Sequence, residues 1–194
     1  MDQLTIAIDG PASSGKSTVA KRIAEELSLV YIDTGAMYRA VTNEVIEQGV
    51  SLENEKEIVQ IARNTEIAFE AASDGQKVFS NGSDVTDVIR EPEVTNAVSQ
   101  VSAYPGVRAE LVRQQREMAK SKGVVMDGRD IGTVVLPEAK VKVFLVASVE
   151  ARARRRFDEN RSKGILTPLK ILTEEIEARD YKDSHRARDR KSVV

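Results

Sequence analysis

The sequence lacks several residue types on which whole classes of chemistry depend. It has no cysteine, no tryptophan and a single histidine, His185, and aromatic residues make up only 4% of its 194 positions. Without cysteine there is no disulfide framework, zinc–thiolate site, iron–sulfur cluster or cysteine nucleophile. A serine–histidine–aspartate triad would have to use His185, which we interpret as an exposed helix residue. The chemistry must therefore come from carboxylates, hydroxyls, lysine, arginine, backbone amides and, where needed, a hard metal ion.

Charge and hydropathy argue against two kinds of partner. Lysine and arginine total 29 and aspartate and glutamate total 31, so the formal net charge is −2. A chain so close to neutral does not coat nucleic acid by bulk electrostatics. The first residues do not form a signal peptide, and no apolar run is long enough to span a bilayer. We expect a single-domain cytoplasmic monomer with no nucleic-acid or membrane partner.

Short apolar runs alternate with helical patterns along most of the chain. Residues 65–90 differ, because the Asp74-Gly75 and Asn81-Gly82 dipeptides predict hairpins and hence a small antiparallel insert. Elsewhere the alternation predicts an α/β fold with a central parallel sheet and helices on both faces. The predicted strands are 4–8, 29–32, 124–126 and 141–146. The predicted helices lie at about 16–27, 36–48, 53–63, 93–103, 107–122, 149–160 and 170–184.

Residues 10–17 match the pattern G-x-x-x-x-G-K-[ST] in full. The glycines let backbone N–H groups surround phosphate, Lys16 can reach the β- and γ-phosphates, and the Ser17 hydroxyl can bind Mg²⁺. A plain strand-to-helix turn is the simpler alternative, but the strand before and the helix after supply the context that the motif needs. GTPases, ATPases and small-molecule kinases share this loop, and no Asn-Lys-x-Asp guanine element is present. The residues predicted to bind ATP are Gly10, Pro11, Ala12, Ser13, Ser14, Gly15, Lys16, Ser17 and Thr18.

Two further polar segments follow predicted strands and should lie beside this loop at the carboxyl edge of the sheet. Arg39 follows the second strand and could pair with a second phosphate, although it could equally be an exposed helix residue. Asp127 ends the third strand, where it could hold Mg²⁺ through water together with Ser17, or simply form a turn. Charged residues in two loops at one edge favour a site for a second phosphorylated substrate.

At this point the sequence closely resembles bacterial cytidylate kinases, from about residue 3 to residue 186. The resemblance implies a P-loop NTP hydrolase-like three-layer fold in one nucleoside monophosphate kinase domain. Its core is expected at about 1–35 and 107–194, its monophosphate-binding region at about 36–106 with the insert at 65–90, and its lid at about 154–164. The segments that carry the resemblance are IDGPASSGKST, DTGAMYR, EVTNAVSQVSAYPGVR, MDGRDIGTVVLP, RARRRFDENRSKG and EARDYKDSHR.

The resemblance also implies individual roles for the acceptor site. Two arginines hold the acceptor phosphate, three residues bind the cytosine, three bind the ribose, and Thr34 of DTGAMYR also contacts the substrate. An arginine donor beside a carboxylate acceptor suits cytosine, whose N3 and O2 accept while its amine donates. The residues expected at the acceptor phosphate are Arg39 and Arg129. Those expected at the cytosine are Ser99, Arg108 and Asp130, and those expected at the ribose are Tyr38, Arg179 and Asp183.

The densest basic run, Arg152 to Arg156, has two simpler interpretations. One is a solvated helix face, and the other is a nucleic-acid patch, which the acidic chain and the lack of interleaved aromatic residues argue against. The resemblance instead implies a lid over ATP, in which Arg155 and Arg156, joined by Arg186, stabilise charge during phosphoryl transfer. Lys16 and Arg129 complete the predicted catalytic set.

The leading hypothesis is an Mg²⁺- and ATP-dependent cytidylate kinase of pyrimidine nucleotide metabolism that converts CMP or dCMP to CDP or dCDP. Another P-loop monophosphate or small-molecule kinase is a related alternative. In family members the segment that matches HRARDRKSVV is usually followed by a strand and a helix, which are not recognisable in this sequence. Because an edge strand and a covering helix would then be missing, we expect exposed apolar surface on the sheet. A nucleotide-binding protein with impaired catalysis is the alternative from a different class.

Overall fold

The computed structural model of the protein describes residues 4–72, 75–120, 122–162 and 164–184. The chain divides into two compact units, and unit 1 comprises Met1–Tyr31 and Lys122–Val194. Unit 2 comprises Ile32–Ser121 and is a single insertion into unit 1. The domain boundaries inferred from the sequence stay a prediction; in this division the helix at 105–119 goes with unit 2.

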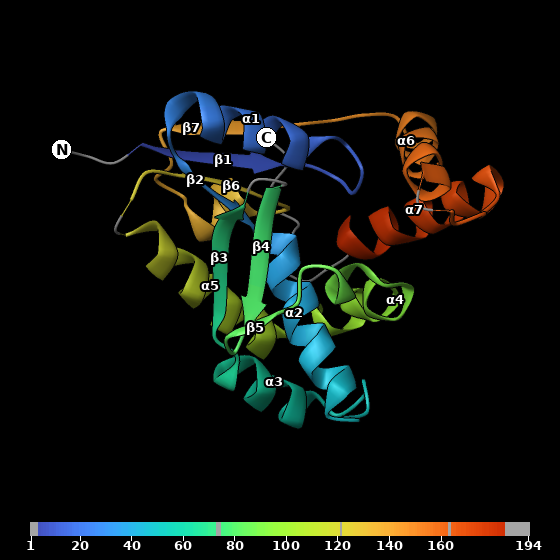
Figure 1. Cartoon of the computed structure of the whole chain (residues 1–194), viewed down its shortest axis with the longest axis horizontal. Helices are drawn as coiled ribbons and strands as arrows, with labels where there is room; N and C mark the ends of the chain where they lie inside the picture. The colour runs from blue at the N-terminus through green and yellow to red at the C-terminus, as the bar shows by residue number, and fades with distance from the viewer. Residues whose placement is uncertain (1–3, 73–74, 121, 163, 185–194) are drawn as a thin grey trace. The chain divides into compact units, whose positions relative to one another are not determined.

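A parallel sheet forms the centre of unit 1 (Figure 1), with the strand order β2-β6-β1-β7. Strand β1 pairs in parallel with β6 and β7, so that Ile6 stands opposite Val125 on one side and Val141 on the other. All of β6 and nearly all of β1 is buried, as expected for central strands covered on both faces. The predicted α/β fold with a parallel sheet is confirmed. The strands are β1 (Thr5–Asp9), β2 (Val30–Asp33), β6 (Val124–Gly128) and β7 (Val141–Phe144).

Helix α1 (Lys16–Leu27) covers one face of this sheet. Ala20 and Ala24, four positions apart and hence on one side of the helix, belong to a buried cluster with Ile6, Ile8 and Val125. Figure 1 shows α1 running alongside β1. Because α1 begins directly after the glycine-rich loop, this packing holds the loop at the carboxyl end of β1.

Strand β7 lies at the edge of the described sheet and is exposed along its length. Val141 and Val143 are more than one-third exposed, and Phe144 is 60% exposed. The expected apolar surface on the sheet is therefore present.

The segment after β6 differs from its prediction. The sequence indicated an irregular loop, whereas residues Ile131–Val135 form a short π-helical turn, η2. The Asp130 carbonyl accepts hydrogen bonds from the amides of Val134 (2.8 Å) and Val135 (3.3 Å). Residues 131–135 are mostly β-branched and prefer extended backbone, so local propensity gives no sign of this turn.

Two further helices complete unit 1, α6 (Val149–Ser162) and α7 (Leu169–Ser184). They pack against each other, as Figure 1 shows in orange and red. None of the helices in the described ranges combines the length and the apolar composition that crossing a membrane requires.

Unit 2 is organised around α2 (Thr34–Glu47), whose Met37, Val41 and Val45 are completely buried. Helices and strands predicted from the sequence are all present, with ends that differ by a few residues. The other elements are α3 (Glu55–Asn64), β3 (Ile67–Ala72), β4 (Gly75–Ser80), β5 (Ser83–Asp84), the 3₁₀ turn η1 (Val88–Arg90), α4 (Pro92–Val101) and α5 (Pro105–Ala119).

The predicted antiparallel insert is confirmed as the three-stranded sheet β3-β4-β5. Asn81 and Gly82 both have positive φ angles, 49° and 82°, as a two-residue type I′ hairpin turn requires. The Ser80 hydroxyl donates to the Glu44 carboxylate at 2.5 Å, which ties the insert to α2. Asp74 of the other predicted hairpin turn lies outside the described residues.

Candidate nucleotide-binding site

The loop between β1 and α1 adopts backbone angles that only glycine takes readily. Gly10 has a φ of +149°, and a Cβ there would stand 2.2 Å from the Leu145 carbonyl oxygen. Gly15 precedes the first residue of α1 with a φ of +96° in the left-handed region. The two glycines of the motif are therefore required by this conformation.

Lys16 is held against the loop that it follows. Its side chain is buried, and its Nζ donates to the Pro11 carbonyl at 2.7 Å and to the Ser14 hydroxyl at 3.4 Å. The loop thus combines backbone N–H groups at a helix N-terminus with a buried cation, which is the arrangement that binds phosphate.

Two arginines of α6 also donate hydrogen bonds to carbonyl oxygens of the same loop. Arg155, which the sequence predicted to be near ATP, donates from Nη1 to the Ser14 carbonyl at 2.8 Å. Arg152 donates from Nη1 to the Ala12 carbonyl at 3.3 Å. Within unit 1 the arginine-rich helix therefore contacts the glycine-rich loop through Arg152 and Arg155, while Arg154 and Arg155 remain exposed to solvent.

Arg152 is a buried residue beside the glycine-rich loop that the sequence did not single out. It is only 3% exposed and forms a two-point ion pair with Asp180 of α7, at 3.0 and 2.5 Å. Its Nε also donates to the Ala147 carbonyl at 3.0 Å. Arg154, two positions later in the same run, is exposed. Nothing local distinguishes the two arginines, because the partner of Arg152 lies on another helix.

Asp127 and Ser17, predicted to act together, are brought together at the end of β6. The Ser17 hydroxyl donates to Oδ2 of Asp127 at 3.0 Å, and the Tyr31 hydroxyl donates to Oδ1 at 2.8 Å. Asp127 is 5% exposed. Tyr31 was not predicted as a site residue, because an aromatic residue in a buried strand looks like ordinary core.

Asp9, the last residue of β1, also escaped prediction. Its carboxylate accepts hydrogen bonds from the amides of Ile131 and Gly132, both at 2.8 Å. Burial raises the pKa of Asp9 above its usual value, and nearby Asp130 adds to this, while the two amides and Lys16 act in the opposite direction.

Arg129, predicted to hold the acceptor phosphate, pairs with Asp183, predicted to bind the ribose. The Nε of Arg129 lies 3.0 Å from Oδ2 of Asp183, so this pair joins the segment after β6 to α7. Asp130 follows directly and is buried. Arg179, on the same helix as Asp183, is half-buried.

In unit 2, Asp33 organises the start of α2. Its Oδ1 accepts from the Ala36 amide at 2.9 Å as an N-cap, and its Oδ2 lies 3.2 Å from Nη2 of Arg39. The Nε of Arg39 is buried and has no hydrogen-bond partner in the described residues. A buried donor of this kind is available to an anion. Thr34 and Tyr38 belong to the same helix.

Ser99 lies on α4, and the buried Arg108 lies in the first turn of α5. The predicted acceptor residues thus divide between unit 1, with Arg129, Asp130, Arg179 and Asp183, and unit 2, with the remainder. Arg186 and His185 lie outside the described residues. The individual ligand contacts of all these residues stay predictions.

A family comparison decides which class of P-loop protein this geometry belongs to. The family model described as cytidylate kinase matches residues 6–192. The chain belongs to the cytidylate kinase family. The match includes the glycine-rich loop, Asp127 and the arginine-rich helix of unit 1.

Curated relatives agree with this membership in the cytidylate kinase family. The chain is 56% identical over 184 residues to a cytidylate kinase of Ligilactobacillus salivarius strain UCC118, covering 95% of the chain and 82% of the relative. It is also 56% identical over 186 residues to a cytidylate kinase of Enterococcus faecalis, covering 96% and 82%. Solved structures are more distant: a shikimate kinase from Acinetobacter baumannii is 16% identical with a TM-score of 0.40, over 96% of this chain and 81% of that one.

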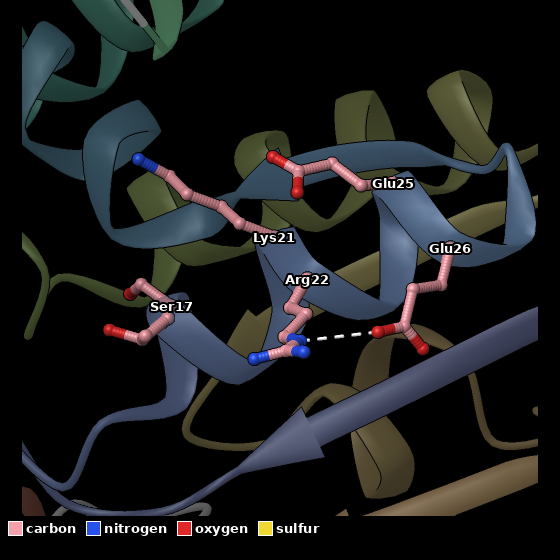
Figure 2. Close-up of a pocket in the computed structure, with 6 residues that line it drawn as sticks. Ser17, Lys21, Arg22, Glu25 and Glu26 are labelled. Carbon is pink, nitrogen blue, oxygen red and sulfur yellow. Dashed lines mark hydrogen bonds and ion pairs between the residues drawn. The ribbon is translucent and has the colours of Figure 1, made fainter.

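A surface depression of unit 1 includes Ser17 and Thr18, two of the residues predicted to bind ATP. It has a volume of about 560 Å³ and lies along α1 (Figure 2). Beyond Ser17 and Thr18 it is lined by charged side chains, of which Arg22 and Glu26 pair at 3.1 Å. Figure 2 shows Lys21 extending away from that pair, and its Nζ lies 5.9 Å from the centroid of the Tyr31 ring.

Proposed function

We propose that this member of the cytidylate kinase family transfers the γ-phosphoryl group of ATP to CMP or dCMP, producing ADP and CDP or dCDP. The observation that carries the proposal is the glycine-rich loop with Lys16 buried against it, in a chain whose family model is cytidylate kinase. Family membership favours this activity over nucleotide binding without catalysis, because the relatives at 56% identity are named as kinases.

On the donor side, the loop amides and Lys16 bind the phosphates of ATP. Arg155 already lies against the loop through the Ser14 carbonyl, and we assign it, with Arg156, to the lid formed by residues of about 154–164. Arg186, which lies outside that segment, is assigned the same charge-stabilising role. Cations around the transferred group stabilise the charge that develops on its oxygens. Positioning and charge neutralisation dominate, because the attacking atom is already a phosphate oxygen.

Mg²⁺ fits the oxygen donors at the end of β6. The Ser17 hydroxyl and the Asp127 carboxylate are 3.0 Å apart, and Mg²⁺ is held by one or two such groups with phosphates and water. Within the described ranges no group of three or more acidic or histidine side chains is gathered as a metal cage. Ser17 would hold the ion directly and Asp127 through water. When bound, Mg²⁺ neutralises negative charge on the transferring phosphates.

On the acceptor side, Arg39 and Arg129 bind the phosphate of CMP. The buried, unpartnered Nε of Arg39 supports this role, since a charged donor gains most from an anionic partner. We assign the cytosine to Ser99, Arg108 and Asp130, and the ribose and the remaining contacts to Tyr38, Arg179, Asp183 and Thr34.

An ADP-release assay with a panel of acceptors tests the proposal. The protein is given ATP and Mg²⁺ with CMP, dCMP, UMP, AMP or shikimate, and we expect turnover to be fastest with CMP and dCMP. A preference for AMP or shikimate would contradict the assignment to cytidine nucleotides. ATP binding by calorimetry without turnover on any acceptor would instead identify a nucleotide-binding protein.

A further inference from the structure

Asp9 stands immediately before the glycine-rich loop, yet its side chain serves a different segment. The carboxylate accepts from the amides of Ile131 and Gly132 at 2.8 Å each. These two residues directly follow Arg129 and Asp130. One buried side chain at the end of β1 therefore holds the segment that carries two proposed CMP ligands.

The backbone of η2 explains why that segment needs an outside partner. The first amides of a helical turn have no carbonyl partner within the turn, and the preceding side chain commonly accepts from them. Asp130 occupies that preceding position but makes no such bond. Asp9 supplies both acceptor oxygens instead. The cap of η2 therefore comes from β1, and the carboxylate of Asp130 is not used for capping.

The two hydrogen bonds that Asp9 accepts are strong because the acceptor is charged and buried. Hydrogen bonds to a carboxylate are stronger than bonds between neutral groups, and both are in a dry setting because Asp9 is only 8% exposed. Asp130 raises the pKa of Asp9 and Lys16 lowers it, so the Asp9 carboxylate interacts electrostatically with both residues.

We propose that Asp9 is a positioning residue for the acceptor nucleotide: through Ile131 and Gly132 it orients Arg129 and Asp130 toward CMP. This inference rests on the proposed function. The glycine-rich loop also accepts hydrogen bonds from Arg152 and Arg155, whereas the start of η2 is held by the bonds that its amides donate to Asp9. Losing an acceptor oxygen of Asp9 therefore affects CMP more than ATP.

Steady-state kinetics of Asp9→Asn tests the assignment. The amide keeps one acceptor oxygen but turns an N–H group toward a backbone donor, so we expect KM for CMP to rise roughly tenfold. KM for ATP is expected to change by less than about threefold. In an Asp130→Ala background, adding Asp9→Asn should raise KM for CMP by less than about threefold, because residues acting as one unit are not additive.

Ile6→Ala is the matched structural control. Ile6 is a buried residue of the same strand, so its truncation lowers the melting temperature through a cavity while leaving the ratio of the two KM values unchanged. Should Asp9→Asn not fold at the assay temperature, Asp9→Glu keeps the charge and both oxygens but displaces them by one methylene. It should also raise KM for CMP more than KM for ATP.

The outcomes separate this inference from the proposed function. Absence of CMP turnover by the unmodified protein would contradict the proposed function, and this assignment with it. Normal turnover by the unmodified protein, combined with equal rises in both KM values or with an unchanged KM for CMP in the Asp9 variants, would overturn the assignment alone.

Discussion

Two loops at the carboxyl ends of neighbouring strands in unit 1 are held in contrasting ways. The loop after β1 takes its shape mainly from its own residues: Gly10 and Gly15 adopt positive φ angles, and Lys16 bonds back to Pro11. The segment after β6 becomes a π-helical turn whose first amides are bound by Asp9, more than one hundred positions away in the chain.

The contrast shows how much of a site's conformation can be predicted from a short sequence motif. A loop whose own glycines set much of its conformation is recognisable from a few consecutive residues, even though Arg152 and Arg155 also bond to it. A loop capped by a distant side chain gives no such sign, although its hydrogen bonds are equally short. The predictions below test whether these two loops serve separable tasks.

Lys16→Ala should have the largest effect. Removing the buried ammonium takes away a cation from the transferring phosphate and also the hydrogen bond to the Pro11 carbonyl, so turnover should fall about 10³-fold or more. CMP binding, measured by calorimetry, should remain largely intact. The control is Arg22→Ala, which removes an exposed cation from the same helix and should have near-normal turnover. Loss of CMP binding in Lys16→Ala would contradict the proposal that the two loops serve separate tasks.

Asp180→Ala tests the brace on the glycine-rich loop. It leaves the guanidinium of Arg152, 3% exposed, without its counterion, and we expect the free energy of unfolding to fall by about 3 kcal/mol. Urea denaturation measures the change. Asp158→Ala removes an exposed carboxylate from α6 and should cost less than about 0.5 kcal/mol. Equal stability of the two variants would show that the ion pair does not brace the loop.

Arg129→Ala addresses the other loop. CMP loses a charge-assisted contact, so its binding should weaken by about 1.5–3 kcal/mol in calorimetry, while ATP affinity changes little. The control is Arg113→Ala, which removes an arginine that is 64% exposed and paired with Glu110 on α5. CMP affinity equal to that of the unmodified protein would remove Arg129 from the acceptor site.

The smallest effect is expected from Asp33→Ala, in unit 2. Loss of the α2 cap should cost about 1 kcal/mol of stability, and KM for CMP should rise several-fold because Arg39 loses its partner. Asn54→Ala removes the corresponding cap of α3. It should lower stability similarly without altering KM for CMP, and an identical KM in both variants would show that Asp33 acts only on the helix.

Much of the fold was predictable because its signals are local. Apolar spacing located the strands and helices to within a few residues, and Asn81-Gly82 identified a hairpin turn that the φ angles confirm. The turn η2 was missed, because its β-branched residues favour strand and its geometry depends on Asp9. In the candidate site, Ser17 and Asp127 are in contact, while their role in holding Mg²⁺ stays a prediction. Tyr31 and Arg152 could not be told apart from ordinary core and surface residues.

The sequence by itself determined the class of fold, the phosphate-binding loop and the family resemblance, since these depend on the order and spacing of neighbouring residues. Only the tertiary structure decided which of several similar arginines is buried, which carboxylate caps η2 and which hydroxyls hold Asp127. The physical reason is common to all three. Each role is set by a partner from a distant part of the chain. Hydrogen bonds and ion pairs need their partners within a short distance, and only folding brings such distant residues that close together.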